Sequence, residues 1–329
     1  MQYRTLGASG LQVSPICLGT MTFGTPVSEP DAIKLVHGAI DLGVNFIDTA
    51  NSYEGYARIP GSPGGLGEQI TGKAIGDKRE KVILATKVGS PLGLGPMDKG
   101  LSATHVHREL DNSLRRLQTD YIDLYIIHWP DKLVPLETTL SAMEVAVRQG
   151  KIRHFGVSNH TAWQICRLLW LAEQQGGPKV IASQVPFSLL RRDFTNDLDF
   201  CRQFNVAVTP YQSLQGGLLA GKYRRDQKPP TGSRGADKPQ WMWPMDDKLY
   251  DKLEAIETLA NHTGVPVSQY VLAWTLAQPA MTSLVVGATR LEQIKNAMSA
   301  IDVTVPDEHF AKIDSVFPPP WQQGDPIRD

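Results

Sequence analysis

The chain of 329 residues has little of several features that would define a class of protein. Neither sign of charge prevails, since 33 basic residues face 34 acidic ones, so a nucleic-acid partner has no electrostatic support. No apolar run approaches the length that spans a bilayer, and the amino-terminal stretch lacks a basic region followed by a long apolar one. We therefore expect a cytoplasmic protein with no nucleic-acid and no membrane partner.

Cysteine is also scarce, with three residues in the whole chain. Cys17, Cys166 and Cys201 are odd in number, widely spaced and set in apolar surroundings. This pattern favours buried thiols over disulfides, metal ligands or a nucleophile.

Short β-rich runs alternate with amphipathic helical stretches almost to the end of the chain. The eight runs cover residues 15–20, 45–50, 81–87, 122–128, 154–159, 181–187, 206–212 and 283–288. Such alternation is typical of repeated βα units, and eight units predict a closed parallel barrel. Residues 30–43 and 103–118 carry the spacing and end signals of outer helices. We therefore predict an α/β fold, a (β/α)8 TIM barrel, with residues 1–329 forming a single domain.

Three further segments concern the two ends of this barrel. Residues 3–16 predict a β-hairpin that plugs the bottom of the barrel. The connections 54–67 and 212–244 are longer than βα loops usually are, and both follow the carboxyl ends of predicted strands. Long loops there are more often substrate lids or cofactor clamps than linkers, and a disordered surface insertion is the alternative.

Asp48, Tyr53, Lys87 and His128 lie at or just beyond the ends of successive strand-like runs. Because parallel strands end at one mouth of a barrel, we expect these four side chains to converge there. The set is suited to proton transfer to a carbonyl: Tyr53 donates a proton, and His128 orients the oxygen. We expect Lys87 to lower the phenol pKa from its usual value of about 10, and Asp48 to hold Lys87.

Each of the four residues also has an ordinary structural interpretation. Asp48 alone would cap a turn, Tyr53 would be a half-buried loop aromatic, and Lys87 would be an exposed strand terminus. His128 alone would be a core histidine with satisfied hydrogen bonds. The occurrence of all four at predicted barrel-mouth positions favours the functional interpretation.

Several long segments resemble the aldo-keto reductase family, in the right order and over almost the whole chain. They include RTLGASGLQVSPICLGTMTFG, GVNFIDTANSY, DYIDLYIIHWPD, GKIRHFGVSNH and TPYQSLQGGLLAGKY. The group that the chain is most similar to contains the β subunits of voltage-gated potassium channels and many bacterial reductases. The resemblance implies a (β/α)8 barrel, a nicotinamide cofactor bound without a Rossmann fold, and a catalytic tetrad on the four residues above.

The resemblance also implies cofactor contacts. Ser158, Asn159 and Gln184 match the side chains that hydrogen-bond the nicotinamide carboxamide, and Tyr211 matches the aromatic that stacks on its ring. Arg290 is available to a 2′-phosphate, which favours NADPH over NADH. The full set assigned to the cofactor is Thr20, Met21, Asp48, Ser158, Asn159, Gln184, Tyr211, Gln212, Ser213, Leu214, Gly216, Gly217, Lys222, Arg234, Gly287, Thr289, Arg290, Gln293 and Asn296.

The chain departs from the family pattern in two places. Ala297 stands where relatives usually have an adenine-facing Asn, so NADH stays open as the cofactor. The insertion after Tyr53 should reshape the substrate entrance, and it carries Arg58, which either meets a polar or anionic substrate or is merely solvated. Trp129 either packs the barrel end or walls the substrate pocket. The residues assigned to the substrate are Tyr53, His128, Trp129 and Arg58.

Other polar and aromatic pairs carry weaker signals. His105 and His107 lie two apart on a predicted helix and face different directions, and no acidic ligand set accompanies them, so we expect no metal. Arg191 and Arg192 read as a solvated pair, with contact to an acidic substrate group as the alternative.

The sequence as a whole predicts an NADPH-dependent alcohol and carbonyl oxidoreductase. It would reduce a small polar aldehyde, ketone or sugar, reversibly with the alcohol, with Tyr53 as proton donor. The rival from another class is a regulatory subunit that binds a nicotinamide nucleotide with little turnover. Trp241 and Trp243 are suited to a lid or to a subunit interface, so the sequence leaves open whether the protein forms a homo-oligomer. Selectivity is expected in the loops after Tyr53 and Gln212 and in residues 318–329.

Overall fold

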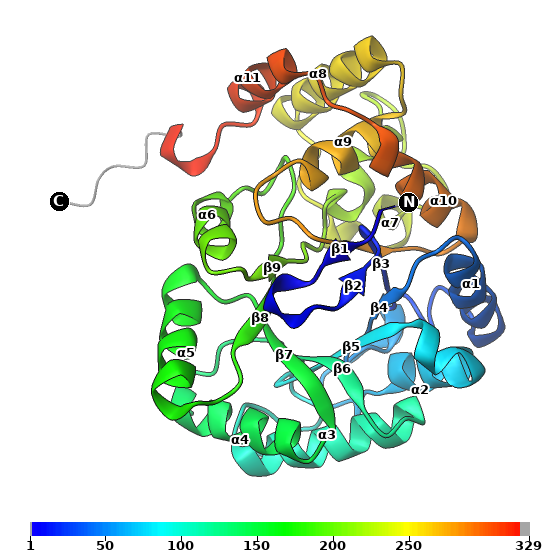
Figure 1. Ribbon diagram of the computed structural model, residues 1–329. Coiled ribbons are helices and arrows are strands. Elements are labelled where there is room, and N and C mark those ends of the chain that lie inside the picture. Colours follow the sequence, from blue (N-terminus) through cyan, green and yellow to red (C-terminus); the bar gives the residue numbers. More distant parts are fainter. Residues whose placement is uncertain (1, 323–329) are drawn as a thin grey trace.

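The computed structural model describes residues 2–322, and its centre is a parallel barrel (Figure 1). The eight strands follow the order β10–β3–β4–β5–β6–β7–β8–β9, and every neighbouring pair is parallel. Parallel bridges from Val208 to Met281 and from Tyr211 to Val285 join the last strand to the first and close the ring. The strands are β3 (Ile16–Gly19), β4 (Phe46–Asp48), β5 (Ile83–Val88), β6 (Ile122–Ile127), β7 (Ile152–Ser158), β8 (Val180–Gln184), β9 (Ala207–Val208) and β10 (Leu284–Gly287).

Helices surround the barrel (Figure 1). They are α1 (Glu29–Asp41), α2 (Leu66–Ile75), α3 (Ala103–Leu117), α4 (Leu136–Arg148), α5 (Ala162–Gln175), α6 (Thr195–Gln203), α7 (Arg234–Asp237), α8 (Asp247–Thr263), α9 (Val267–Leu276), α10 (Leu291–Ser299) and α11 (Asp307–Val316). In α3, Ser102 caps the amino terminus by accepting from the His105 amide, and Val106 and Leu110 are buried. The (β/α)8 fold and both predicted outer helices are confirmed.

The amino-terminal hairpin closes one end of the barrel. Strands β1 (Arg4–Thr5) and β2 (Gln12–Val13) are antiparallel, and Figure 1 shows them lying across the barrel. Leu6 and Val13 are fully buried in one cluster with Phe46 and Leu124 from the strands. Gly7 has a φ of +53°, and a Cβ there would overlap the backbone of β8, so only glycine lets the hairpin sit this close. The predicted plug is confirmed.

The two long loops after β4 and β9 contact each other. Both carry short helical turns: η2 (Gly55–Ala57) in the first, and η4 (Gln215–Ala220), α7 and η5 (Pro239–Trp241) in the second. The ring of Tyr56 packs edge-on against Trp241 at 5.1 Å, and Lys238 Nζ lies 3.4 Å from the Tyr56 carbonyl oxygen. The loop after β4 and the loop after β9 are therefore joined by direct contacts.

The prediction for the cysteines is partly wrong. Cys17 and Cys201 are buried, but Cys166 is exposed. Its apolar surroundings in the sequence include Trp163 and Trp170, which lie on the outer face of α5 and are 64% and 60% exposed. Within residues 2–322, no helix is long and apolar enough to cross a membrane. The assignment of residues 1–329 to a single domain stays a prediction.

Candidate active site

Lys87 is the centre of the polar site at the carboxyl end of the barrel. Its ammonium donates to Asp48 Oδ1 at 2.5 Å, to the Thr49 carbonyl at 2.9 Å and to the Tyr53 hydroxyl at 3.0 Å. Burial alone favours a neutral amine, but the charge of Asp48 and the bonds to Asp48 and Tyr53 outweigh it. The pKa of Lys87 is therefore raised, and the side chain is a fixed cation although it is fully buried.

Asp48 ends β4 and has its two oxygens fully engaged. Oδ1 accepts from Lys87, and Oδ2 accepts from Gln184 Nε2 at 2.9 Å. Because β4 and β8 lie on different sides of the barrel, the carboxylate links distant strands. The predicted pair of Asp48 and Lys87 is formed.

Tyr53 lies in the irregular segment between β4 and α2. Burial raises the pKa of its phenol, and although Lys87 lowers it, the net shift is upward. The expectation that Lys87 gives this phenol a net lowered pKa is therefore wrong. The net shift is upward because the loss of water around the phenol and the negative charge of Asp48 raise the pKa by more than the Lys87 cation lowers it.

His128 follows β6 and faces Tyr53, with ring centroids 6.1 Å apart. Burial and the charges of Lys87 and Arg58 lower the pKa of His128 well below its usual value, so the ring is neutral at pH 7. Its Nδ1 lies 3.0 Å from Ser90 Oγ, a partner that the sequence analysis did not identify. Either ring nitrogen can carry the proton of a neutral imidazole; if Ser90 donates to Nδ1, the ring proton lies on Nε2.

Three residues assigned to the nicotinamide gather beside His128. Ser158 is the last residue of β7, and Asn159 follows it with a φ of +61°. Asn159 Nδ2 donates to the His128 carbonyl at 2.9 Å and to Ser158 Oγ at 3.0 Å. The Tyr211 hydroxyl donates to Asn159 Oδ1 at 2.8 Å. These contacts tie three strand ends into one polar wall.

Thr20 and Met21 follow β3 on the opposite flank. The Thr20 amide donates to the Asp48 carbonyl at 2.9 Å, which brings this turn to the site. Among residues 2–322, the hydroxyls of Thr20 and Ser213 are buried without a hydrogen-bond partner. Gln212, beside Ser213, is exposed and has a φ of +60°. Both orphaned hydroxyls are suited to a polar ligand at this position.

A glycine turn brings two cations together after Leu214. Gly216 and Gly217 have φ values of +65° and +95°, which favour glycine. A Cβ at Gly217 would lie 2.9 Å from Lys222 Nζ, and one at Gly216 would lie 3.3 Å from the Arg234 guanidinium. The turn, the ammonium and the guanidinium therefore form a cradle of positive charge with close backbone approach.

The residues assigned to the adenosine end lie around β10 and α10. Gly287, Thr289 and Arg290 are exposed. Gln293 Oε1 accepts from the Thr289 amide at 2.7 Å, which fixes the turn into α10. Asn296 bonds two side chains of α9 and is thus engaged within the fold.

The substrate-side residues are held by the loops. Arg58 bonds Glu54 Oε2 at 3.2 Å and the Pro91 carbonyl at 2.5 Å, so its guanidinium links the insertion to the loop after β5. Trp129 stacks on His128 with centroids 5.8 Å apart, and half of its surface is exposed. One face of Trp129 is therefore open beside the His128 imidazole.

The expectation of a solvated arginine pair is wrong for Arg192. Arg191 is half-exposed and bonds Asp193, but Arg192 is buried and donates to Asp314 at 2.6 Å and to the Phe317 carbonyl at 2.7 Å. Buried arginines need such partners, and both lie far away in the sequence.

The two histidines considered as ligands lie apart from any such site. His105 is buried and bonds the Met97 carbonyl at 3.0 Å, whereas His107 is half-buried. In the described part of the chain, no group of three or more His, Cys, Asp or Glu side chains is placed to hold a metal ion. The selectivity assigned to residues 318–329 falls partly outside the described residues, which end at 322.

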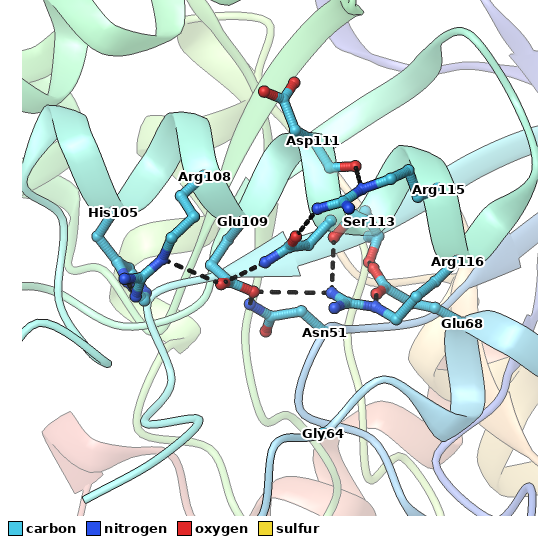
Figure 2. A network of polar contacts seen from close by, with 12 residues as sticks. Asn51, Gly64, Glu68, His105, Arg108, Glu109, Asp111, Ser113, Arg115 and Arg116 are labelled. Atoms are coloured by element: carbon cyan, nitrogen blue, oxygen red, sulfur yellow. Dashed lines mark hydrogen bonds and ion pairs between the residues drawn. The ribbon is translucent and has the colours of Figure 1, made fainter. Parts of the chain in front are cut away.

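The sequence analysis missed a buried polar network beneath the segment that carries Tyr53. Figure 2 shows Glu68 from α2 together with Glu109 and Arg116 from α3. In the sequence these residues look like ordinary polar positions of amphipathic helices. Nothing in their spacing indicates that they face the barrel.

The geometry defines a class of protein: an α/β barrel whose mouth holds a carboxylate, an ammonium, a phenol and a neutral imidazole. The model of the aldo/keto reductase family matches residues 15–317, and the chain belongs to this family. It is 35% identical to the uncharacterized oxidoreductase YrpG of Bacillus subtilis, over 97% of both chains. It is 34% identical to the protein tas of Escherichia coli, over 96% of this chain and 97% of that protein. A probable voltage-gated potassium channel subunit beta of Arabidopsis thaliana is 31% identical, over 92% of each.

Proposed function

We propose that this protein is an NADPH-dependent reductase of small polar aldehydes, ketones or sugars, acting reversibly with the alcohol. The single observation that carries the proposal is the hydroxyl of Tyr53, 3.0 Å from the Lys87 ammonium that Asp48 holds. A half-buried tyrosine whose hydroxyl bonds a fixed cation is a proton donor with a defined position. We further propose that it acts in the cytoplasm on a small-molecule substrate.

The residues around the mouth fit a nicotinamide dinucleotide. The cradle of Gly216, Gly217, Lys222 and Arg234 suits a pyrophosphate, because it combines two cations with close backbone approach. Exposed Arg290 suits a 2′-phosphate. The remaining cofactor contacts that we propose are Thr20, Met21, Asp48, Ser158, Asn159, Gln184, Tyr211, Gln212, Ser213, Leu214, Gly287, Thr289, Gln293 and Asn296. When bound, the cofactor supplies a hydride.

The chain's own residues move the proton. His128, neutral with its proton on Nε2, donates a hydrogen bond to the carbonyl oxygen and sets its position. The Tyr53 hydroxyl gives its proton to that oxygen as negative charge develops there. The Lys87 ammonium then lies 3.0 Å from the phenolate oxygen and stabilises it, while Asp48 keeps Lys87 in place.

The raised pKa of Tyr53 agrees with the reductive direction. A proton donor must be protonated before the reaction, and a phenol whose pKa is raised above its usual value is protonated at pH 7. Alcohol oxidation needs the phenolate as base, so it should require more alkaline conditions. For the substrate we propose contacts to Trp129 and Arg58, in addition to Tyr53 and His128.

Replacing Tyr53 with Phe tests the proposal, because it keeps the ring and removes the proton. Carbonyl compounds, including glyceraldehyde, would be screened for NADPH consumption, and the best one would be used for both proteins. We expect the single-turnover rate to fall by orders of magnitude, with the Kd for NADPH unchanged. Tyr250→Phe on α8 is the matched control. Near-normal reduction by the Tyr53→Phe protein would overturn this mechanism.

The relative named as a potassium channel subunit supports a second candidate, a nicotinamide-binding regulatory subunit with little turnover. A regulatory subunit would bind NADPH tightly, turn over none of the screened carbonyl compounds and co-purify with a partner protein. The same screen therefore distinguishes the two.

A further inference from the structure

A charged cluster lies buried between the barrel and helices α2 and α3. Glu68 is fully buried, Glu109 is 4% exposed, and the Arg116 side chain lies between them (Figure 2). Arg116 Nε donates to Glu68 Oε2 at 2.6 Å, and its Nη2 lies 3.7 Å from Glu109 Oε2. Glu68 Oε1 accepts from Thr86 Oγ1 at 2.5 Å. Arg116 thus bonds Glu68 and lies near Glu109, whose other oxygen accepts from Asn112 Nδ2 at 2.9 Å and lies 3.6 Å from Arg108 Nε.

This cluster contacts the segment before Tyr53. Asn51 Nδ2 donates to Glu109 Oε2 at 3.5 Å, and the Asn51 amide donates to the Lys87 carbonyl at 3.3 Å. The side chain of Asn51 is therefore bonded to the cluster, and its backbone is bonded to β5. Only Ser52 separates Asn51 from Tyr53 in the chain.

The same cluster also contacts the segment after Tyr53. Gly65, the cap of α2, has a φ of +89°, and a Cβ there would lie 2.7 Å from Arg116 Nε. Gly64 packs equally closely on the Asn51 carbonyl. The Gly67 amide donates to the Tyr53 carbonyl at 2.8 Å, one residue before Glu68. The segment before Tyr53 and the segment after it therefore both contact Arg116 or one of its partners.

The cost of this arrangement argues for a role beyond packing. Tyr53 lies in a stretch from 49 to 65 that belongs to no strand and no α-helix, so regular structure does not fix its place. Burying charges costs free energy that ion pairing only partly offsets. Burial raises the pKa of Glu68 even against the bonds from Arg116 and Thr86. Apolar residues would fill this space at lower cost but would not accept the hydrogen bonds from the side chains of Asn51 and Thr86.

We propose that Arg116 is a positioning residue, which sets the place of the Tyr53 hydroxyl through Asn51 and Glu109 on one side and Glu68 and Gly65 on the other. It touches neither the substrate nor the reacting atoms. The inference rests on the proposed function, in which that hydroxyl gives the proton. A shift of about 1 Å at a proton donor costs up to about a hundredfold in rate.

Arg116→Lys is the first test variant, because it keeps the cation and removes the second arm of the guanidinium. Glu68→Gln is the second test variant, because it removes the negative charge but keeps the shape of the side chain and an oxygen that can accept from Thr86. Arg115→Lys on the same helix is the matched control, since Arg115 is exposed and its hydrogen bonds to other described residues stay within α3. We expect a single-turnover rate with glyceraldehyde and NADPH about tenfold lower in both test variants, with the Kd for NADPH unchanged.

The decisive comparison combines Arg116→Lys with Tyr53→Phe. If Arg116 acts through the hydroxyl, its replacement has no further effect on the residual rate once that hydroxyl is gone. An equal loss in both backgrounds would overturn the proposal, because it would show a general structural role.

Hydrogen exchange of the protein without ligands gives a readout that needs no activity. The amides of Thr49, Asn51 and Tyr53 donate to backbone carbonyls, so their exchange reports on this segment. We expect Arg116→Lys to speed exchange in residues 49–56 and to leave α9 unchanged. Unchanged exchange in 49–56 would overturn the proposal. Faster exchange in a protein that reduces no carbonyl would reject the proposed function and leave the positioning role standing.

Discussion

The side-chain amide of Gln184 donates a hydrogen bond to the carboxylate of Asp48 at 2.9 Å across the barrel. Both side chains are almost completely buried. Gln184 thus supports the pair of Asp48 and Lys87, in addition to the nicotinamide contact that the family resemblance assigns to it.

Gln184→Leu should therefore affect stability as well as cofactor affinity. It leaves Asp48 Oδ2 buried without its donor, and we expect a loss of about 1–3 kcal/mol in the free energy of unfolding. Denaturant unfolding at pH 7 measures this loss, with Gln174→Leu at an exposed site of α5 as the control. Equal stability of the two variants would show that the bond to Asp48 contributes nothing.

The pH dependence of the two reaction directions should differ. Because burial raises the pKa of Tyr53, the phenol stays protonated through neutral pH, and kcat/KM for reduction should fall only in the alkaline range. Alcohol oxidation uses the deprotonated form, so its rate should rise with pH over that same range. Measuring both profiles with one carbonyl and its alcohol checks this, and a reduction rate that falls between pH 6 and pH 8 would contradict it.

Cofactor preference should depend on Arg290. If its exposed guanidinium meets a 2′-phosphate, Arg290→Met removes a charged hydrogen bond worth about 1.5–3 kcal/mol. We expect the Kd for NADPH to rise about ten- to a hundredfold, while the Kd for NADH stays unchanged. Fluorescence titration with both nucleotides measures this, and Arg115→Met is the control. Equal weakening for both nucleotides would place Arg290 elsewhere in the site.

The buried His309 should make stability depend on pH. His309 of α11 lies 3.1 Å from His262 and 2.8 Å from the Tyr270 hydroxyl. Burial lowers the pKa of His309, and the positive charges of His262 and Lys312 lower it further, while Glu308 opposes them. The folded protein thus keeps this ring neutral at pH values where the unfolded chain, with a pKa of about 6.5, takes up a proton.

The free energy of unfolding should accordingly fall as the pH drops below about 6.5. His309→Phe should be less stable at pH 7.5, because His262 and Tyr270 lose their partner, yet its stability should change less with pH. Denaturant unfolding from pH 5 to pH 8 checks both statements. His37→Phe is the control, since that ring bonds a backbone carbonyl and no histidine. An unchanged slope in the His309 variant would refute this role of His309.

The strands and the four mouth residues were predictable because both follow from local patterns. Each strand is a short apolar run, and the ends of parallel strands must meet, so the approach of Asp48 to Lys87 follows from topology. The pKa of Tyr53 was not predictable, because its direction depends on burial that a sequence does not state. The same holds for Arg192, whose partner Asp314 lies 122 residues away.

The network beneath Tyr53 was missed for a related reason. Glu68 and Arg116 occupy positions that would be equally ordinary on a solvent-facing helix surface, and no spacing rule pairs residues 48 apart. Cys166 shows the converse error, since its apolar neighbours Trp163 and Trp170 belong to an exposed face. Charged side chains are usually exposed and tryptophans are usually at least partly buried, so residue type alone predicts neither the buried ion pair nor the exposed tryptophans. Both are visible only in the folded structure.

The hairpin that closes the barrel base gives the two ends of the barrel different roles. Leu6 and Val13 pack among Phe46 and Leu124, so apolar side chains close this end. In the proposed mechanism, Tyr53 gives up its proton at the other end, where the strands terminate. Under that mechanism we expect reprotonation and product release to take place at the same end of the barrel, where the loops that carry Tyr56 and Trp241 contact each other.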